Sequence, residues 1–180
     1  MHIVLRVTHE VSNLRTPKAY RAIRRAVDRC RARADFRVTH ASIQSNHIHL
    51  LVEADDKDAL RSGMQGFAIS AARRLNRELR RARGEVFAYR YHATAITSPA
   101  QARNAVSYIV NNWRHHRCDR YDVRRFDPYA SAHAIREWRI ARDPDQLPVV
   151  SPTTWLLTDG YRRGGEPIRP DEVPGPDPTP

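Results

Sequence analysis

The order in which the hydrophobic pattern changes along residues 1–115 is the strongest constraint on the fold of this chain. Segments in which apolar and polar residues alternate predict strands, and segments with apolar residues three and four positions apart predict helices. The predicted elements, in chain order, are a strand at 2–8, a helix at 17–33, strands at 36–44 and 47–54, a helix from Asp55–Asp58 to Gly84, a strand at 86–97 and a helix from Thr97-Ser98-Pro99 to about 115. This β-α-β-β-α-β order predicts an α+β fold of the ferredoxin-like type, in which two helices cover one face of a four-stranded antiparallel sheet. The other face stays open for a ligand or for the last helix.

The composition changes after residue 143. Nine of the twelve prolines lie in this part, and the final residues, EVPGPDPTP, cannot build a core. We therefore expect a folded domain at 1–117, a C-terminal extension at 118–165 and a Pro-rich, disordered tail at 166–180. A short apolar stretch at 154–157 is expected to pack back on the domain.

The charge of the chain is strongly positive and unevenly distributed. The net charge is +11, but residues 1–142 carry 28 Lys and Arg against 13 Asp and Glu, whereas residues 143–180 carry 3 against 7. A large positive field predicts a polyanionic partner, most often nucleic acid. All but two of the basic residues are Arg. An Arg-rich proteome would explain the choice of Arg over Lys, but not the excess of charge.

Two classes of protein are disfavoured by what the sequence lacks. Cys30 and Cys118 have no CxxC spacing, so neither a zinc cage nor a disulfide framework is predicted, and a reducing compartment is the default. No stretch approaches the roughly 18 apolar residues of a membrane helix, and the N-terminal apolar run is too short for a signal peptide. We expect a cytoplasmic protein without membrane contact, and we identify no organic cofactor.

Two histidines in the strand at 47–54 are the first candidate site. Because side chains alternate in a strand, His47 and His49 point to one face while Ile48 and Leu50 point to the other. Two imidazoles on one face can share a transition metal, and added oxygen ligands would admit Mg²⁺ or Mn²⁺. A pair of surface histidines without a metal is the alternative.

The last predicted helix supplies the other candidates. Tyr108 and Asn112 are four residues apart and therefore share one side of the helix. The amide oxygen of Asn112 would complete a His-His-Asn ligand set, and the phenol of Tyr108 can attack phosphorus to give a phosphotyrosyl ester. The alternative is that Tyr108 packs on the sheet and that Asn112 is a polar position near the helix end.

Basic and aromatic residues near these elements are candidates for binding DNA, because single strands bind to basic grooves and stacking platforms. For the residues on the helix that ends near Gly84, a solvated helix face is the competing interpretation. The predicted contacts are Arg73, Arg77, Arg80, Arg114, Arg117 and Trp113.

Three segments in this order resemble the single-tyrosine HUH transposases, the IS200-like and REP-associated tyrosine transposases. Asn46-His47-Ile48-His49-Leu50-Leu51-Val52 resembles their NH[VI]HLL signature, Phe87-x-x-x-Tyr91-His92 their fourth-strand region, and Tyr108-Ile109-x-x-Asn112 the segment that carries their nucleophile. The resemblance covers about residues 1–117. Trp113 departs from the pattern, since the family usually has Pro there.

The resemblance implies a single-stranded DNA endonuclease and transposase that cuts and rejoins hairpin-forming sites through a 5′-phosphotyrosine intermediate. Tyr108 would be the nucleophile, and His47, His49 and Asn112 would bind Mg²⁺ or Mn²⁺. A non-catalytic nucleic-acid-binding module of the same fold is the alternative, and a replication-initiation or relaxase-type nickase would share the chemistry. Both a monomer and a homodimer stay open, as does whether Tyr108 acts on the metal site of its own chain.

Overall fold

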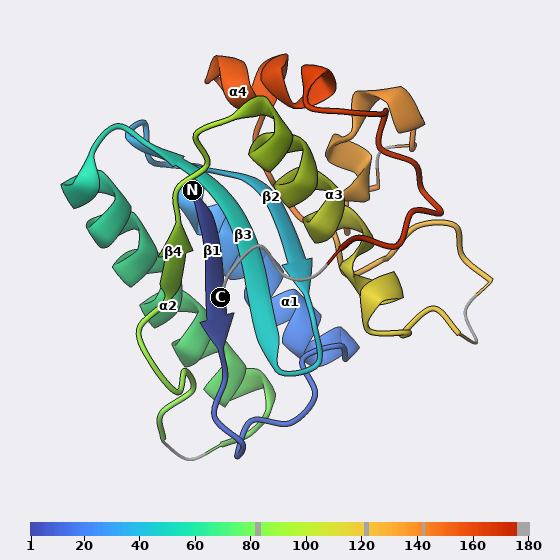
Figure 1. Cartoon of the computed structure of the whole chain (residues 1–180). Coiled ribbons are helices and arrows are strands. Elements are labelled where there is room, and N and C mark those ends of the chain that lie inside the picture. Colours follow the sequence, from blue (N-terminus) through green and yellow to red (C-terminus); the bar gives the residue numbers. More distant parts are fainter. Residues whose placement is uncertain (82–83, 121–122, 142, 176–180) are drawn as a thin grey trace.

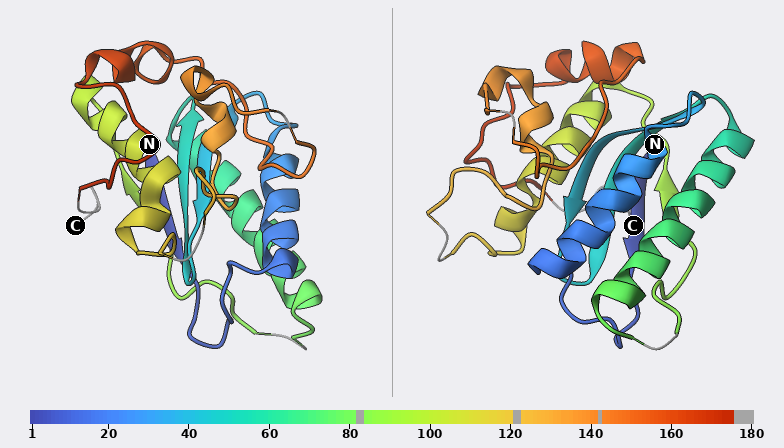
Figure 2. Two further views of the ribbon diagram at one scale, coloured as in Figure 1. Left: turned by 90° about the vertical axis from the view of Figure 1, so that its right-hand side faces the viewer. Right: turned by 180° about the vertical axis from the view of Figure 1, so that it is seen from behind.

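The computed structural model describes residues 1–81, 84–120, 123–141 and 143–175, and its centre is a four-stranded sheet with helices on both faces (Figures 1 and 2). The main elements are β1 (His2–Arg6), α1 (Pro17–Cys30), β2 (Phe36–Ile43), β3 (His47–Ala54), α2 (Lys57–Glu78), β4 (His92–Thr94) and α3 (Pro99–His115). The strands lie in the order β2-β3-β1-β4, and every neighbouring pair is antiparallel. The predicted β-α-β-β-α-β order and antiparallel sheet are confirmed.

The main core lies between the sheet and the layer of α1 and α2. Ile48, Leu50 and Val52 of β3 are fully buried in it, and Ile23 and Val27 of α1 pack from the helical side. The sequence determines this arrangement, because one side of each strand and one stripe of each helix are apolar. The right-hand view of Figure 2 shows α1 and α2 side by side in front of the sheet, and the left-hand view shows α3 on the opposite face.

Helix α2 ends earlier than predicted. It begins as expected, with the carboxylate of Asp56 accepting a hydrogen bond from the backbone of Ala59 at 2.7 Å, but its last helical residue is Glu78 rather than one next to Gly84. Arg80 adopts a left-handed backbone with φ of 54°, and the N–H of Arg81 donates to the carbonyl of Asn76. This closing motif usually contains glycine at the left-handed position, so the sequence signal pointed to Gly84 instead.

Strand β2 contains a bulge. Its pairing with β3 shifts by one residue between Val38 and His40, so that Val38 faces Val52 and His40 faces Leu51. The predicted hairpin between β2 and β3 is confirmed. Because a bulge adds one residue to one strand, the apolar side chains of β2 before and after it can point to the same core.

The predicted strand at 86–97 is much shorter in the structure. Only His92–Thr94 forms β4, and Phe87 makes an isolated bridge with Val7. The N–H of Ala88 still donates to the carbonyl of Arg6, and the chain then leaves the sheet at residues 89–91. β4 is an edge strand that pairs only with β1. The residues between Phe87 and β4 therefore have no second strand to keep them extended.

The C-terminal extension covers the second sheet face together with α3. It contains η1 (Ala132–Ala134), η2 (Arg136–Trp138), α4 (Trp155–Thr158) and η3 (Gly160–Arg163). The predicted docking of the apolar stretch is confirmed, since Leu157 packs with Ile109 of α3 and Leu51 of β3. The carboxylate of Glu53 accepts four hydrogen bonds from the backbones and hydroxyls of Thr153 and Thr154 and ties the extension to the end of β3.

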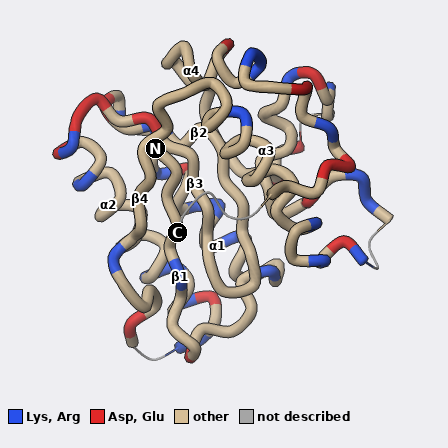
Figure 3. Tube along the Cα trace, in the orientation of Figure 1, with Lys and Arg blue, Asp and Glu red and all other residues tan. Residues whose placement is uncertain are grey.

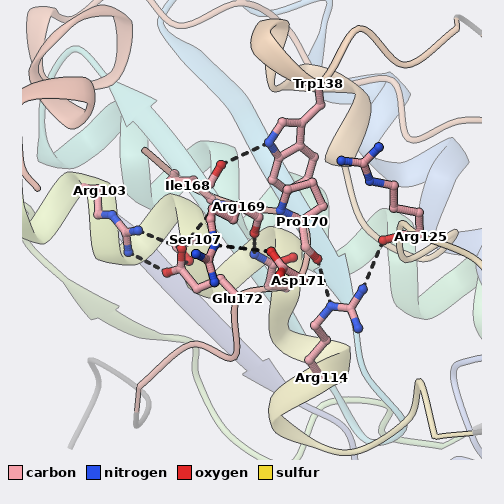
Figure 4. A network of polar contacts seen from close by, with 11 residues as sticks. Arg103, Ser107, Arg114, Arg125, Trp138, Ile168, Arg169, Pro170, Asp171 and Glu172 are labelled. Carbon is pink, nitrogen blue, oxygen red and sulfur yellow. Dashed lines mark hydrogen bonds and ion pairs between the residues drawn. The ribbon is translucent and has the colours of Figure 1, made fainter. Parts of the chain in front are cut away.

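Residues 166–175, which we call the C-terminal segment, were predicted to be disordered, and this prediction is wrong for them. Figure 4 shows the segment lying along α3. Glu172 forms a two-pronged ion pair with Arg103 at 2.5 and 2.7 Å and accepts the hydroxyl of Ser107 at 2.6 Å. Backbone carbonyls of the segment accept from Asn111 and Arg114. Side chains of α3 supply the partners that the Pro-rich composition lacks; residues 176–180 lie outside the described residues.

Basic residues are spread over the whole molecule rather than gathered on one face (Figure 3). Within the described part of the chain, no helix is both long and apolar enough to cross a bilayer. Both cysteines are unbridged, with Cys30 buried and Cys118 exposed.

Candidate active site

The two histidines of β3 lie on the sheet face that α3 covers. His47 and His49 are 7% and 0% exposed, and the centroids of their rings are 4.6 Å apart. Leu51, two residues further on, packs against α3, which fixes the direction of this side of the strand. The predicted common orientation of the two imidazoles is therefore confirmed, and both are far more buried than surface histidines.

Helix α3 brings Tyr108 to these histidines. The helix begins at Pro99, where the hydroxyl of Ser98 accepts from the backbone of Gln101, and it packs on β2 and β3. The ring of Tyr108 lies edge-on to that of His49, with the centroids 5.2 Å apart, and the tyrosine is 3% exposed. The phenol and the imidazoles thus meet within one chain.

Asn112 is the most unusual polar residue of the described structure. It is fully buried one turn beyond Tyr108, and neither its amide oxygen nor its amide nitrogen has a hydrogen-bond partner among the described residues. A buried polar group without a partner costs about 1–3 kcal/mol, so such groups are rare unless they have a function. Nε2 of His49 is buried and without a partner in the same way.

His2 was not predicted as a site residue, but it holds His49. Its Nε2 lies 3.1 Å from Nδ1 of His49, and the two rings stack with centroids 5.2 Å apart. Because Nδ1 is engaged by His2, Nε2 is the nitrogen of His49 left for another partner. The sequence held a signal, since a histidine in the first strand can reach the neighbouring strand, but only the register of β1 on β3 makes the contact visible.

Electrostatics keep His49 neutral. Burial, and after it the neighbouring His47, His2 and His116, hold the pKa of His49 well below its ordinary value. Neutral imidazole is the form that ligates metals. On the other histidine, Nδ1 of His47 lies 2.7 Å from the side-chain oxygen of Asn46, which orients that ring.

These residues fit a divalent ion. Among the described residues, no group of three or more His, Cys, Asp or Glu side chains is arranged to hold a metal. A ligand set of two imidazoles and one amide oxygen is not such a group, because it contains Asn. An ion bound by this set would be a common partner for the unpartnered atoms of His49 and Asn112. Nitrogen and neutral oxygen ligands suit Mn²⁺ and, with waters or phosphate oxygens, Mg²⁺.

Two more histidines surround the same place. The ring of His116 lies 5.6 Å from that of His47, and the ring of His115 lies 5.9 Å from that of Tyr108. Both are exposed and stand at the end of α3. They form the outer side of a cluster whose inner side is buried.

The predicted DNA contacts on α2 are not brought to this cluster. Arg73, Arg77 and Arg80 are exposed, but α2 lies on the opposite face of the sheet (Figure 2). The first two line a cavity of about 510 Å³ on the helical layer. A single ligand could contact both these residues and the cluster only by passing around an edge of the sheet.

The predicted contacts after Tyr108 have different fates. Trp113 is fully buried, so its indole cannot stack on a base in this conformation, and that part of the prediction is wrong. A proline at position 113 would have interrupted the helix, whereas with Trp113 the helix α3 continues to His115 and the indole packs inside. Arg114 pairs with Asp119 at 2.7 Å and donates to the carbonyls of Pro170 and Arg125 (Figure 4). Arg117 is exposed beside the cluster.

Comparison with known proteins agrees with the fold. Residues 1–112 match the protein family described as "Transposase IS200 like", and the chain therefore belongs to the IS200-like transposase family. Among solved structures, it is similar to a REP-associated tyrosine transposase bound to a REP hairpin, with 15% sequence identity, a TM-score of 0.55, and coverage of 83% of this chain and 92% of the other. At this identity the likeness shows the fold. No curated protein matches the chain.

Proposed function

We propose that this chain is a metal-dependent endonuclease and strand transferase that acts on single-stranded, hairpin-forming DNA through Tyr108. The observation that carries the proposal is the contact of Tyr108 with His49, whose buried Nε2 has no partner among the described residues, as is also true of both amide atoms of Asn112 one turn further along α3. A purely structural cluster would leave no reason to bury an amide without partners. Family membership, and the hairpin bound to the similar solved structure, support DNA as the substrate.

In the proposed reaction, the phenolic oxygen of Tyr108 attacks the scissile phosphorus while the 3′-oxygen of the neighbouring nucleotide leaves. The product is a 5′-phosphotyrosine and a free 3′-hydroxyl, and attack by a 3′-hydroxyl on that ester reverses the step and rejoins a strand without ATP. The phenolic proton leaves in the same step, and we assign its acceptor to His115, whose ring centroid lies 5.9 Å from that of Tyr108.

His47, His49 and Asn112 would hold the divalent ion, which when bound would polarise the phosphate and orient it for in-line attack. The chain itself contributes the orientation of these ligands. His2 and Asn46 each engage the Nδ1 of one imidazole, and Nε2 of each ring would be the nitrogen that binds the ion. Burial of Tyr108 and His49 keeps water from competing with the phosphate.

The geometry favours action within one chain, because Tyr108 already lies beside His49 of the same chain. A mixture of Tyr108→Phe and His49→Ala proteins should then show no activity. Recovery of cleavage in the mixture would show that the tyrosine acts on a partner's metal site.

The experiment that tests the proposal is detection of a covalent protein–DNA adduct on a denaturing gel, with hairpin oligonucleotides from the flanks of the protein's own gene and Mn²⁺ or Mg²⁺. We expect an adduct that requires the metal and that is absent in Tyr108→Phe. Tyr20→Phe is the matched control, because that phenol bonds to the carbonyl of Asp145, away from the cluster. An adduct in Tyr108→Phe would refute the nucleophile, and salt-sensitive binding without an adduct under any metal would favour a binding module.

A further inference from the structure

An open cavity of about 670 Å³ lies at the end of the sheet next to His47. This size is typical of sites that take a small molecule or one unit of a polymer. It is bounded by the end of β1 and the residues after it, by the turn between β2 and β3, and by the segment before β4. Its polar and aromatic lining includes Arg6, His9, Asn13, Ser45, Asn46 and Tyr89.

Backbone hydrogen bonds hold the three walls together. The N–H of Val7 donates to the carbonyl of Asn46 at 2.9 Å, and the N–H of Ala88 donates to the carbonyl of Arg6 at 3.0 Å. Tyr89 therefore follows directly after a residue that is bonded to β1. The backbones of the three walls are therefore joined to one another next to His47.

Tyr89 projects from this wall with its side chain open to solvent. It is 80% exposed, whereas most large apolar side chains of the described residues are buried. A rigid aromatic ring beside a polar cavity is the usual platform for stacking a nucleobase, because every base has a π-face.

Arg6 supplies a cation without a neutralising partner. It is exposed, and it pairs in register with His47. It forms no ion pair with any residue of the described part of the chain, whereas Arg103 and Arg114 are paired with carboxylates. An unpaired guanidinium beside an aromatic platform suits a phosphate, which it can bind through two parallel hydrogen bonds.

Asn46 connects the cavity to the metal ligands. Its backbone carbonyl forms one wall, and its side-chain oxygen holds Nδ1 of His47 at 2.7 Å. A nucleotide bound here would lie next to the phosphate that His47 faces.

We propose that this cavity binds the nucleotide that flanks the scissile phosphate, with Arg6 on its phosphate and Tyr89 stacked on its base. The location of the reaction rests on the proposed function, whereas binding of single-stranded DNA at these two residues does not. The flanking base would then be chosen at the cavity, and the cut would be placed a fixed distance from it.

The test measures binding without chemistry. A fluorescein-labelled single-stranded DNA of about ten nucleotides and mixed sequence is titrated, without metal, into full-length Tyr108→Phe protein and followed by anisotropy. We expect Tyr89→Ala and Arg6→Ala each to weaken binding about tenfold, and Tyr89→Trp to restore it. Arg6→Ala should also lower the slope of log affinity against log salt by about one, because one phosphate contact is lost.

Two controls match these variants. Arg21→Ala removes an exposed cation of α1, on the other face of the sheet, and Trp155→Ala removes the other strongly exposed aromatic residue of the described structure. Both should bind as the parent does. If Tyr89→Ala and Arg6→Ala also bind like the parent, or if the controls lose as much, the inference is wrong.

Failure of this inference can be told apart from failure of the proposed function. If the wild-type protein forms no covalent adduct but both cavity variants still bind weakly, the cavity binds DNA and the assigned chemistry is wrong. The adduct can also form at the same rate in the wild-type protein and in both cavity variants when DNA is limiting. In that case the proposed chemistry is supported and the cavity has no role in binding.

Discussion

The two sides of α3 differ in whether their polar side chains have hydrogen-bond partners. On the outer side, Arg103, Ser107 and Asn111 all find partners in the C-terminal segment. On the side toward the sheet, Asn112 is buried with no partner for either amide atom among the described residues. Asn111 and Asn112 are neighbours, chemically identical and almost equally buried, so neither burial nor residue type explains the difference.

The comparison separates structure from function within one helix. Polar groups that are satisfied by the chain contribute to stability, and their removal should lower it. Polar groups that are left unsatisfied lower stability and persist where a ligand completes them. The outer side of α3 therefore anchors the C-terminal segment, and the inner side is where the proposed ion would bind.

The pair of asparagines offers the largest expected effect. Asn112→Leu should weaken Mn²⁺ binding by at least about 100-fold, since a proposed ligand is lost, while the metal-free protein unfolds at the same or a higher temperature. Mn²⁺ affinity is read from the electron paramagnetic resonance signal of free Mn²⁺, and stability from thermal unfolding with chelator. Asn111→Leu should do the reverse, with unchanged affinity and a loss of about 1–2 kcal/mol. Equal effects of the two variants on Mn²⁺ binding would break the comparison.

The outer side is tested by Glu172→Gln. The neutral amide cannot form the ion pair with Arg103, so the free energy of unfolding should fall by about 1–2 kcal/mol, an amount kept small because both side chains are partly solvated. Urea unfolding at pH 7 measures it, with Glu166→Gln, an exposed neighbour, as the control. A loss of Mn²⁺ affinity in Glu172→Gln would show that the two sides of α3 are coupled.

His2→Ala tests the inner side of α3, where His2 holds the ring of His49. Without the bond from His2, the ring of His49 loses its fixed orientation, and Mn²⁺ binding should weaken about tenfold while the fold persists. His2→Gln keeps a side chain that can bond to Nδ1 and should restore part of the affinity. His92→Ala, on the same sheet face but exposed, should have no effect. Unchanged affinity in His2→Ala would remove His2 from the site.

The smallest expected effect concerns a buried histidine that faces the extension. Burial first, and then the neighbouring His133, lower the pKa of His40 to about 4. An unfolded imidazole has a pKa near 6.5, so below that value the unfolded chain takes up a proton that the folded chain does not. Acid therefore destabilises the fold, by about 0.7 kcal/mol between pH 7 and pH 6 from this residue alone. Urea unfolding at the two pH values should show this loss in wild type and a smaller one in His40→Gln; equal losses would contradict the assignment.

Much of the fold could be predicted because its elements are locally determined. The start of α1 after Thr16 and that of α3 after Ser98 carry capping hydroxyls and a proline, and both begin where predicted. The common face of His47 and His49 followed from alternation alone. The end of α2 at Glu78 did not, because an arginine takes a backbone conformation that favours glycine.

The contacts that the sequence could not predict join distant residues. His2 meets His49 only through the register of two strands, and the partnerless state of Asn112 depends on everything packed around α3. The C-terminal segment was misjudged because composition describes what a segment can bury by itself. Its order comes from Arg103 and Arg114 of another element.

The bulge in β2 bears on how this sheet tolerates a change of length. Phe36 and Val38 before it, and Ala41 and Ile43 after it, all face the main core. Were Thr39 absent, strict alternation would leave each of these four side chains on its present side. The extra residue is therefore not needed to keep the apolar side chains of β2 on the core face. What it adds is local twist in β2, the strand that borders the extension. A chain without Thr39 would keep its core, and its β2 would be a straighter strand where the C-terminal extension packs against it.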